Sequence, residues 1–254
     1  LGGVAALIAL LVLLFTVILP VRVTDEKKIG LNETYLTLQE TAVTKDTVRQ
    51  LNKLKQLETL NIRDCTVEDN ALDGLKCPKL RSFTLLNTQV ENYAFLDNSP
   101  QISSMTLNNC GVTDSNISLA GFEKLRHLNL NDNPGFTDLT VLQLPVLQEL
   151  YVSRTGVTDV SCLTQGAELR KLEAAGNQIT SIDALAGMED LTTLNFADCQ
   201  IPAVTQPFMS LSMKEINMNG NGLTDLSGFG NFTVLREARL GGNQLTDVSW
   251  LEKN

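Results

Sequence analysis

Few side chains in this 254-residue chain have types and spacing that suit chemistry. The single histidine, His127, excludes a metal site or a proton relay that needs two imidazoles. The sequence holds no motif typical of a serine nucleophile, a phosphate-binding loop or a zinc-binding histidine pair. We therefore predict no enzyme activity, no catalytic residue, no metal site and no cofactor, and we expect His127 to lie on the surface.

The cysteines and aspartates also favour structural roles. Five cysteines are too few for a disulfide scaffold, and Cys77 and Cys162 fall on connecting segments too far apart to pair. Aspartates recur shortly after each expected strand, but one per repeat cannot supply the six to eight oxygens of a calcium site. We expect them to accept backbone N–H groups where the return segments begin. They are Asp69, Asp114, Asp138, Asp159, Asp225 and Asp247.

These residues recur because the chain contains an internal repeat. The frame L-x-x-L-x-L-x-x-[N/C/T]-x-L begins ten times at intervals of 22 to 24 residues, and LRHLNLNDN (residues 125–133) is the clearest copy. The frames begin at Glu33, Leu57, Leu80, Ile102, Leu125, Leu147, Leu169, Leu191, Met213 and Leu235. The frame resembles that of the leucine-rich repeat family, and tails such as VTDVSCL and LTDVSWL are similar to those of its 22-residue, bacterial internalin-like class.

The resemblance implies an α/β solenoid, a horseshoe with a parallel β-sheet on its concave face and short 3₁₀ or helical return segments. The residue pattern agrees, because frame positions four and six are apolar around one solvent-facing residue, as in a half-buried strand. Stacked repeats bury these apolar faces together. Residues Asp46–Leu57 show helical spacing. We expect a repeat domain over residues 33–254, with about ten repeats and an incomplete C-terminal end.

Frame position nine holds Asn, Cys or Thr in every repeat. The backbone turns into the solenoid interior at this point, where its polar groups have no water, so a side chain that forms hydrogen bonds is needed. We predict a structural ladder with buried free thiols at its cysteines. Its members are Cys65, Cys110, Asn133, Asn177, Cys199, Asn221 and Asn243.

Residues 1–20 are apolar and carry no charge, which is enough to span a hydrocarbon core of about 30 Å as a helix. We expect a transmembrane helix or uncleaved signal anchor that contacts the lipid bilayer, followed by a juxtamembrane linker over residues 21–32. A cleaved signal peptide is the alternative, although no small-residue cleavage site follows the run. The absent N-terminal methionine suggests a longer protein and leaves the membrane orientation open.

The solvent-facing positions of the strands are the expected ligand-binding surface. Most are small and polar, so the middle of the array offers the best group of interaction residues. The candidates are His127, Asn129, Tyr151, Arg154, Lys171 and Glu173. The alternative is an ordinary solvated ladder of cross-strand pairs with no partner.

The net charge of −9 argues against a nucleic-acid partner, because binding one requires clustered Lys and Arg to neutralise phosphates.

From the apolar segment and the repeats together, we expect a single-pass, membrane-anchored module whose repeats lie outside the cytoplasm, at the cell surface, and bind a protein or another surface ligand. The resemblance to internalin-like proteins implies adhesion or receptor recognition. One alternative is the sensor domain of a longer receptor with a cytosolic, kinase-like enzymatic part. The other is a structural scaffold without a separate ligand.

Overall fold

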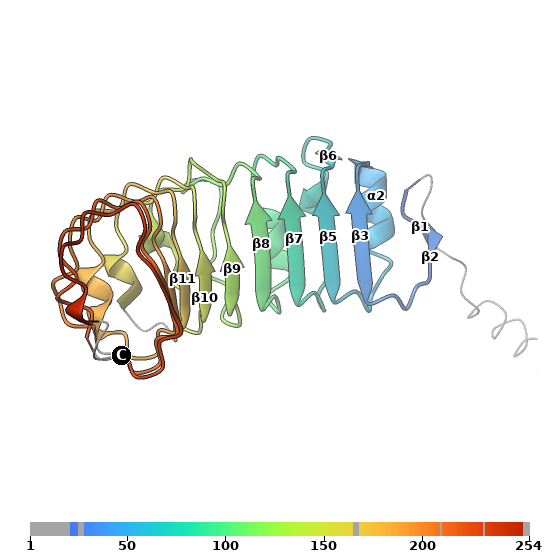
Figure 1. Ribbon diagram of the computed structural model, residues 1–254. Helices are drawn as coiled ribbons and strands as arrows, with labels where there is room; N and C mark the ends of the chain where they lie inside the picture. Colours follow the sequence, from blue (N-terminus) through green and yellow to red (C-terminus); the bar gives the residue numbers. More distant parts are fainter. Residues whose placement is uncertain (1–20, 25–27, 165–167, 209, 231, 251–254) are drawn as a thin grey trace, which may run out of the picture.

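A computed structural model describes residues 21–24, 28–164, 168–208, 210–230 and 232–250. Its main feature is one parallel sheet of ten strands, in which successive repeats supply neighbouring strands (Figure 1). The strands are β3 (Tyr35–Gln39), β5 (Thr59–Arg63), β7 (Ser82–Leu86), β8 (Ser104–Asn108), β9 (His127–Asn129), β10 (Glu149–Tyr151), β11 (Lys171–Glu173), β12 (Thr193–Asn195), β13 (Glu215–Asn217) and β14 (Glu237–Arg239). The predicted solenoid with a parallel sheet is confirmed.

The repeats stack in register, so each frame position forms a column across the sheet. Leu128, Leu150 and Leu172 face one another on adjacent strands, and all three are fully buried. Each such leucine contributes about 1.5–3 kcal/mol when it leaves water. The residue between two buried positions points out of the sheet, so every repeat presents the same positions to solvent.

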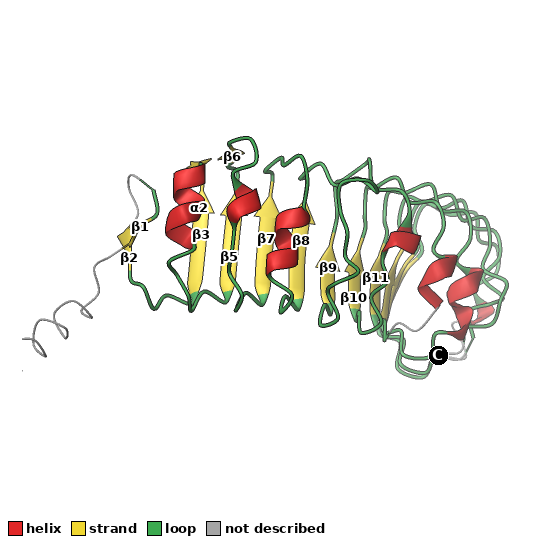
Figure 2. Ribbon diagram, turned by 180° about the vertical axis from the view of Figure 1, so that it is seen from behind, coloured by secondary structure: helices red, strands yellow, loops and turns green. Residues whose placement is uncertain are grey.

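The return segments cover the opposite side of the sheet (Figure 2). Their described residues contain one helix, α2 (Lys45–Leu51), and short 3₁₀ turns, which are the predicted kind of return segment. The turns are η1 (Leu72–Gly74), η2 (Ala94–Asn98), η3 (Leu139–Val141), η4 (Ser161–Thr164) and η5 (Asp183–Gly187). Two small sheets complete the described structure: β1 (Val21–Arg22) pairs antiparallel with β2 (Lys28–Ile29), and β4 (Ala42–Val43) pairs parallel with β6 (Thr66–Val67).

Helix α2 is shorter than the predicted helical segment, which extended to Leu57. Thr44 and Thr47 form a capping box at its start, and the helix ends at Leu51. Beyond it, the Asn52 amide donates to the Gly74 carbonyl and accepts from the Lys76 N–H, both at 2.7 Å in the next repeat. Leu57 is still buried. The apolar spacing over Asp46–Leu57 therefore marks the residues that face the core and does not require a continuous helix.

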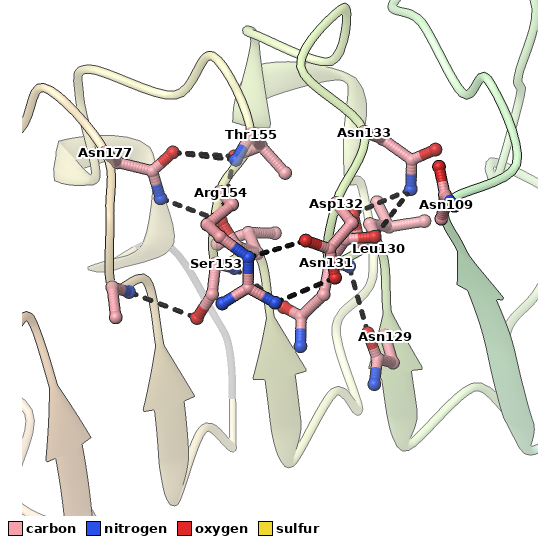
Figure 3. Close-up of polar contacts among 12 residues, drawn as sticks. Asn109, Asn129, Leu130, Asn131, Asp132, Asn133, Ser153, Arg154, Thr155 and Asn177 are labelled. Carbon is pink, nitrogen blue, oxygen red and sulfur yellow. Dashed lines mark hydrogen bonds and ion pairs between the residues drawn. The ribbon is translucent and has the colours of Figure 1, made fainter.

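The Asn side chains at position nine bond the backbone where each repeat turns inward. The Asn133 Oδ1 accepts from the N–H groups of Cys110 and Val112, both at 3.0 Å in the preceding repeat. Its Nδ2 donates to the carbonyls of Leu107 and Leu130 at 2.7 and 2.8 Å. Nδ2 also donates to the Asn131 carbonyl at 3.1 Å, so one buried amide bonds five backbone groups in two repeats. Figure 3 shows the contacts of this amide within its own repeat.

The other members of this column make similar bonds. Asn177, Asn221 and Asn243 each donate from Nδ2 to one carbonyl of their own repeat and one of the preceding repeat. The thiols of Cys65, Cys110 and Cys199 donate to backbone carbonyls at 3.2, 3.1 and 3.4 Å. All five cysteines of the chain are free.

Position eight, just before this column, adopts a left-handed backbone in all ten repeats. Three members are glycine, and the other seven have φ between 48° and 62°. This region disfavours most L-residues, and Asp, Asn and Gly populate it most readily. The column is Glu40, Asp64, Asn87, Asn109, Asp132, Arg154, Gly176, Asp198, Gly220 and Gly242. This column was not among the predicted features, although its Asp, Asn and Gly content is the signal.

Aspartates do accept backbone N–H groups at the return segments, in two ways. Asp138, Asp159, Asp225 and Asp247 bond the N–H two residues later at 2.7–2.8 Å. Asp114 instead reaches the next repeat, where its Oδ1 accepts from the Thr137 N–H at 2.8 Å. In the described part of the chain, the Asp69 carboxylate makes no such bond, so capping is wrong for that residue.

The predicted transmembrane helix of residues 1–20 lies outside the described residues. Among the residues that are described, no helix is long and apolar enough to cross a membrane. The predicted linker contains the β1–β2 pair, and Val23 is buried in the core beside it.

We expect Asn133→Ala to lower the free energy of unfolding by about 3 kcal/mol or more, because it leaves several buried backbone groups without partners. Urea denaturation measures the change. Asn98→Ala is the control, since Asn98 is an exposed residue of η2, and it should shift the free energy by less than about 0.5 kcal/mol. Equal effects of the two substitutions would contradict the role of the ladder.

Candidate functional site

Five of the six candidate binding residues lie on three adjacent strands near the middle of the sheet. His127 and Asn129 come from β9, Tyr151 from β10, and Lys171 and Glu173 from β11. The register brings them together, because the Cα atoms of equivalent positions in neighbouring repeats are paired. These residues share the solvent-facing side of the sheet, opposite the return segments.

Glu149 of β10 connects this group, although it was not among the predicted candidates. Its Oε2 lies 3.1 Å from His127 Nδ1 and accepts a hydrogen bond from the Tyr151 hydroxyl at 2.8 Å. Glu149 occupies the same column as His127 and Lys171, so the register itself was the signal for it. We call His127, Glu149, Tyr151, Lys171 and Glu173 the central cluster.

Aromatic and charged groups in the central cluster are in mutual contact. The His127 and Tyr151 rings lie 5.0 Å apart between centroids, and Lys171 Nζ lies 5.0 Å from the centre of the Tyr151 ring. The same ammonium forms an ion pair with Glu173 Oε1 at 2.8 Å. These contacts hold Tyr151 between a histidine and a cation, in the geometry of a cation–π interaction.

The environment shifts three pKa values in the central cluster. Burial raises the pKa of Glu149, but the hydrogen bonds with Tyr151 and His127 and the nearby Lys171 ammonium outweigh it, so the net pKa is lowered. Burial, followed by the hydrogen bond and charge of Glu149, raises the pKa of Tyr151. The Glu173 hydrogen bond raises the pKa of Lys171. At neutral pH the carboxylate and the ammonium are therefore charged, and the phenol keeps its proton.

Arg154 does not join the central cluster. It follows the strand at position eight, with a φ of 52°, and its Nε and Nη2 bond the two carboxylate oxygens of Asp132 at 2.5 and 2.8 Å (Figure 3). Asn129 supports the same turn, because its Oδ1 accepts from the Asn131 N–H at 2.9 Å. The alternation of inward-facing and outward-facing side chains ends where the backbone turns. Arg154 therefore lies beyond the C-terminal end of β10 and not on the face of the sheet.

The central cluster is suited to binding through polar and aromatic contacts. Its charged side chains remain 26–44% exposed, so a partner can reach them. The described residues contain no group of three or more His, Cys, Asp or Glu placed to hold a metal ion. Burial raises the pKa of Cys77 to about 11 and that of Cys110 to about 12, which keeps these thiols protonated and unreactive.

Two hollows lie near the sheet at other positions. A shallow cavity of about 80 Å³ opens over β12–β14 beside Glu173, and Glu215, Glu237 and Arg239 line it. A larger open hollow of about 940 Å³ lies at the N-terminal end, between residues 22–24 and the first repeat. The larger one is remote from the central cluster, so size alone does not identify the site.

No protein-family model and no curated protein matches the chain. Solved structures do match. An internalin of Listeria monocytogenes superposes with a TM-score of 0.68 at 22% identity, over 89% of this chain and 74% of that one. A leucine-rich repeat protein of Leptospira interrogans gives 0.63 at 16%, over 81% and 66%. The ectodomain of the Arabidopsis thaliana receptor kinase GASSHO1/SCHENGEN3 gives 0.65 at 19%, over 82% and 26%.

At these identities the comparisons establish the leucine-rich repeat fold of the chain. They extend the sequence resemblance to a three-dimensional likeness across most of the repeats. They do not carry a ligand or an activity, which depend on the residues of the site.

We expect Glu149→Gln to lower the pKa of Tyr151, because the substitution removes the negative charge that opposes ionisation of the phenol. A pH titration of the tyrosine ring carbons by NMR measures it. Tyr93 does not interfere, since burial raises its pKa far above the usual range. Glu215→Gln, two strands beyond the central cluster, should leave Tyr151 unchanged. An unaltered titration in Glu149→Gln would contradict the network.

Proposed function

We propose that the chain is a non-catalytic recognition module that binds a protein ligand through the solvent-facing side of its sheet, centred on the central cluster. The observation that carries this proposal is the half-buried group of an aromatic ring, a histidine, a cation and two carboxylates on the solvent-facing side of a regular sheet. Tyrosine is enriched at the energetic centres of protein interfaces. Its amphipathic ring combines apolar contact with a hydrogen-bonding group.

The arrangement of the central cluster favours binding because its side chains are already ordered. Tyr151 is fixed by Glu149 on one side and by Lys171 on the other, so a ligand meets it in a single position. Ordering a long side chain on binding costs about 0.5–1.5 kcal/mol, and the cluster has met much of this cost in advance. Strands from three repeats hold the group, so its shape does not depend on a flexible loop.

Similar folds give support by analogy. The Arabidopsis ectodomain was solved in complex with Casparian strip integrity factor 2, and another leucine-rich repeat domain of this shape, FLRT2, was solved in an assembly with latrophilin 3 and Unc5D. Those partners belong to those proteins. The analogy supports a protein as the class of ligand for this chain.

We expect Tyr151→Ala combined with Lys171→Ala to weaken binding roughly tenfold or more, because it removes the ring and the cation that lies over it. The full chain is screened by biolayer interferometry against purified secreted and cell-surface proteins, and each binder is measured again with the variant. The control is Asp97→Ala combined with Glu189→Ala, two exposed residues on the return side.

The control variant should bind like the wild type. Loss of affinity in the control but not in the Tyr151 variant would place recognition on the return side and contradict the proposal. Failure of the whole panel to bind would favour a scaffold without a separate ligand.

We also propose that residues 1–20 anchor the module in a membrane, with the repeats outside the cytoplasm. The support is the sequence of this segment, which carries no charge over about the length that a membrane helix needs. An apolar run of this length is costly to leave in water. A single anchor would display the sheet to ligands in solution or on another surface.

We expect the full chain, synthesised without cells in the presence of phosphatidylcholine vesicles, to float with the vesicles and resist carbonate extraction. Leu11→Arg combined with Leu14→Arg should release it, since an arginine at mid-helix costs about 2.5–3.5 kcal/mol on insertion scales. Leu31→Arg is the control, because Leu31 is exposed and lies beyond the run. Carbonate extraction of the wild-type chain would contradict the anchor.

A further inference from the structure

The half of the sheet face formed by β3, β5, β7 and β8 differs in charge from the other half. At the three solvent-facing positions of these strands, Arg63 is the one charged residue among hydroxyl, amide and apolar side chains. The remaining residues are Tyr35, Thr37, Gln39, Thr59, Asn61, Ser82, Thr84, Leu86, Ser104, Thr106 and Asn108. Beyond β9, by contrast, the same positions carry Glu149, Glu173, Glu215 and Glu237 against two cations, Lys171 and Arg239, each of which is paired with a glutamate of its own strand.

The Arg63 guanidinium has no ion-pair partner within 4 Å among the described residues, and its Nε is buried without a hydrogen-bond acceptor there. Carboxylates at neighbouring positions are bonded to neutral amides instead. Glu40 accepts from the Gln39 amide at 3.1 Å, and Asp64 accepts from the Asn87 amide at 2.8 Å. Nη1 and Nη2 of Arg63 are not buried and form no hydrogen bond with the described residues, so they are the donors that a ligand can reach.

We propose that Arg63 is a carboxylate-binding subsite, which takes an Asp or Glu side chain of the protein ligand. Guanidinium is planar and presents paired N–H donors that match the two oxygens of a carboxylate. On the sheet face itself the side chains around Arg63 are uncharged, and the Glu40 and Asp64 carboxylates, which lie where the strands end, are bonded to amides and do not occupy its donors. This subsite rests on the proposed function, because it lies on the same face as the central cluster.

The charges also set the direction in which the ligand lies. An acidic group is attracted at Arg63 and repelled over β10–β14, where Glu215 forms no ion pair within the described residues. Complementary charge of this kind selects one register and suppresses the reverse one. The acidic end of the ligand therefore lies toward β5, and its uncharged or basic end toward β11–β14.

The spacing defines the length of the ligand segment. Tyr151 on β10 is four strands from Arg63 on β5, which at about 4.8 Å per strand gives about 19 Å. An extended peptide rises about 3.3 Å per residue, so about six residues bridge the two points. The position-five residues along this path, Thr84, Thr106 and Asn129, are uncharged, so a chain can cross them without burying an unpaired charge.

A random peptide library tests the subsite. Peptides about twelve residues long reach about 40 Å when extended and so span both points. They are displayed on phage and selected against the immobilised full chain. We expect binders that carry Asp or Glu, and we expect Arg63→Gln to weaken them roughly tenfold or more, as does replacing the peptide acid with its amide. The two changes together should weaken binding little more than either alone.

Two further variants separate the subsite from misfolding and from net charge. Arg81→Gln also removes one positive charge, from an exposed side chain directly before β7, and should bind like the wild type. Arg63→Glu should recover binding when the peptide acid is replaced by Lys, which a misfolded protein cannot do.

Three results would overturn the subsite. Binders that are weakened by Tyr151→Ala with Lys171→Ala but not by Arg63→Gln overturn it and leave the proposed function in place. Binders that respond to neither variant overturn both. If sodium sulfate displaces the peptides and sodium acetate of equal ionic strength does not, Arg63 prefers a tetrahedral anion and the carboxylate assignment is wrong.

Discussion

The structure depends on one constraint, which is that the backbone must turn into a dry interior once in every repeat. The side chain at position nine supplies the hydrogen bonds that the backbone groups need there. Asn133 bonds five backbone groups: its oxygen accepts from two N–H groups of the preceding repeat, and its nitrogen donates to one carbonyl of that repeat and two of its own. Each repeat therefore completes the hydrogen bonding of its neighbour, so the repeats are stable as an array and not singly.

This coupling also determines where the surface residues lie. Because neighbouring repeats share hydrogen bonds at the same frame position, no repeat can slip along the next, and the strands remain in register. Side chains some 22 residues apart in sequence then face one another across about 4.8 Å. His127, Glu149 and Lys171 meet for this reason. The ladder thus positions the central cluster without contacting a ligand, while the outward positions remain free to vary.

The sequence predicted the parts of the molecule that follow the repeat, and missed those that depend on local geometry. Strands and core columns followed from the period. Helix α2 ended early because Asn52 bonds the next repeat, which no apolar pattern reveals. Arg154 was placed on the face because strand alternation was extended past the turn, and the left-handed backbone ends that alternation. Glu149 was missed because residues were chosen by type, one at a time, whereas Glu149 matters through its contacts with His127 and Tyr151.

A repeat surface recognises a ligand by position, because all its side chains stand on one evenly spaced grid. The charges on this face are unevenly distributed. Arg63 forms no ion pair with the described residues, and the solvent-facing neighbours on its strands are uncharged, whereas Lys171 and Arg239 are each paired with a carboxylate of their own strand. Paired cations add little attraction for a distant anion, since their fields are largely cancelled. The unpaired guanidinium therefore dominates the attraction at its end. A ligand with its charges reversed along the axis would place an acid over Glu215 and a base over Arg63, and both contacts would be repulsive.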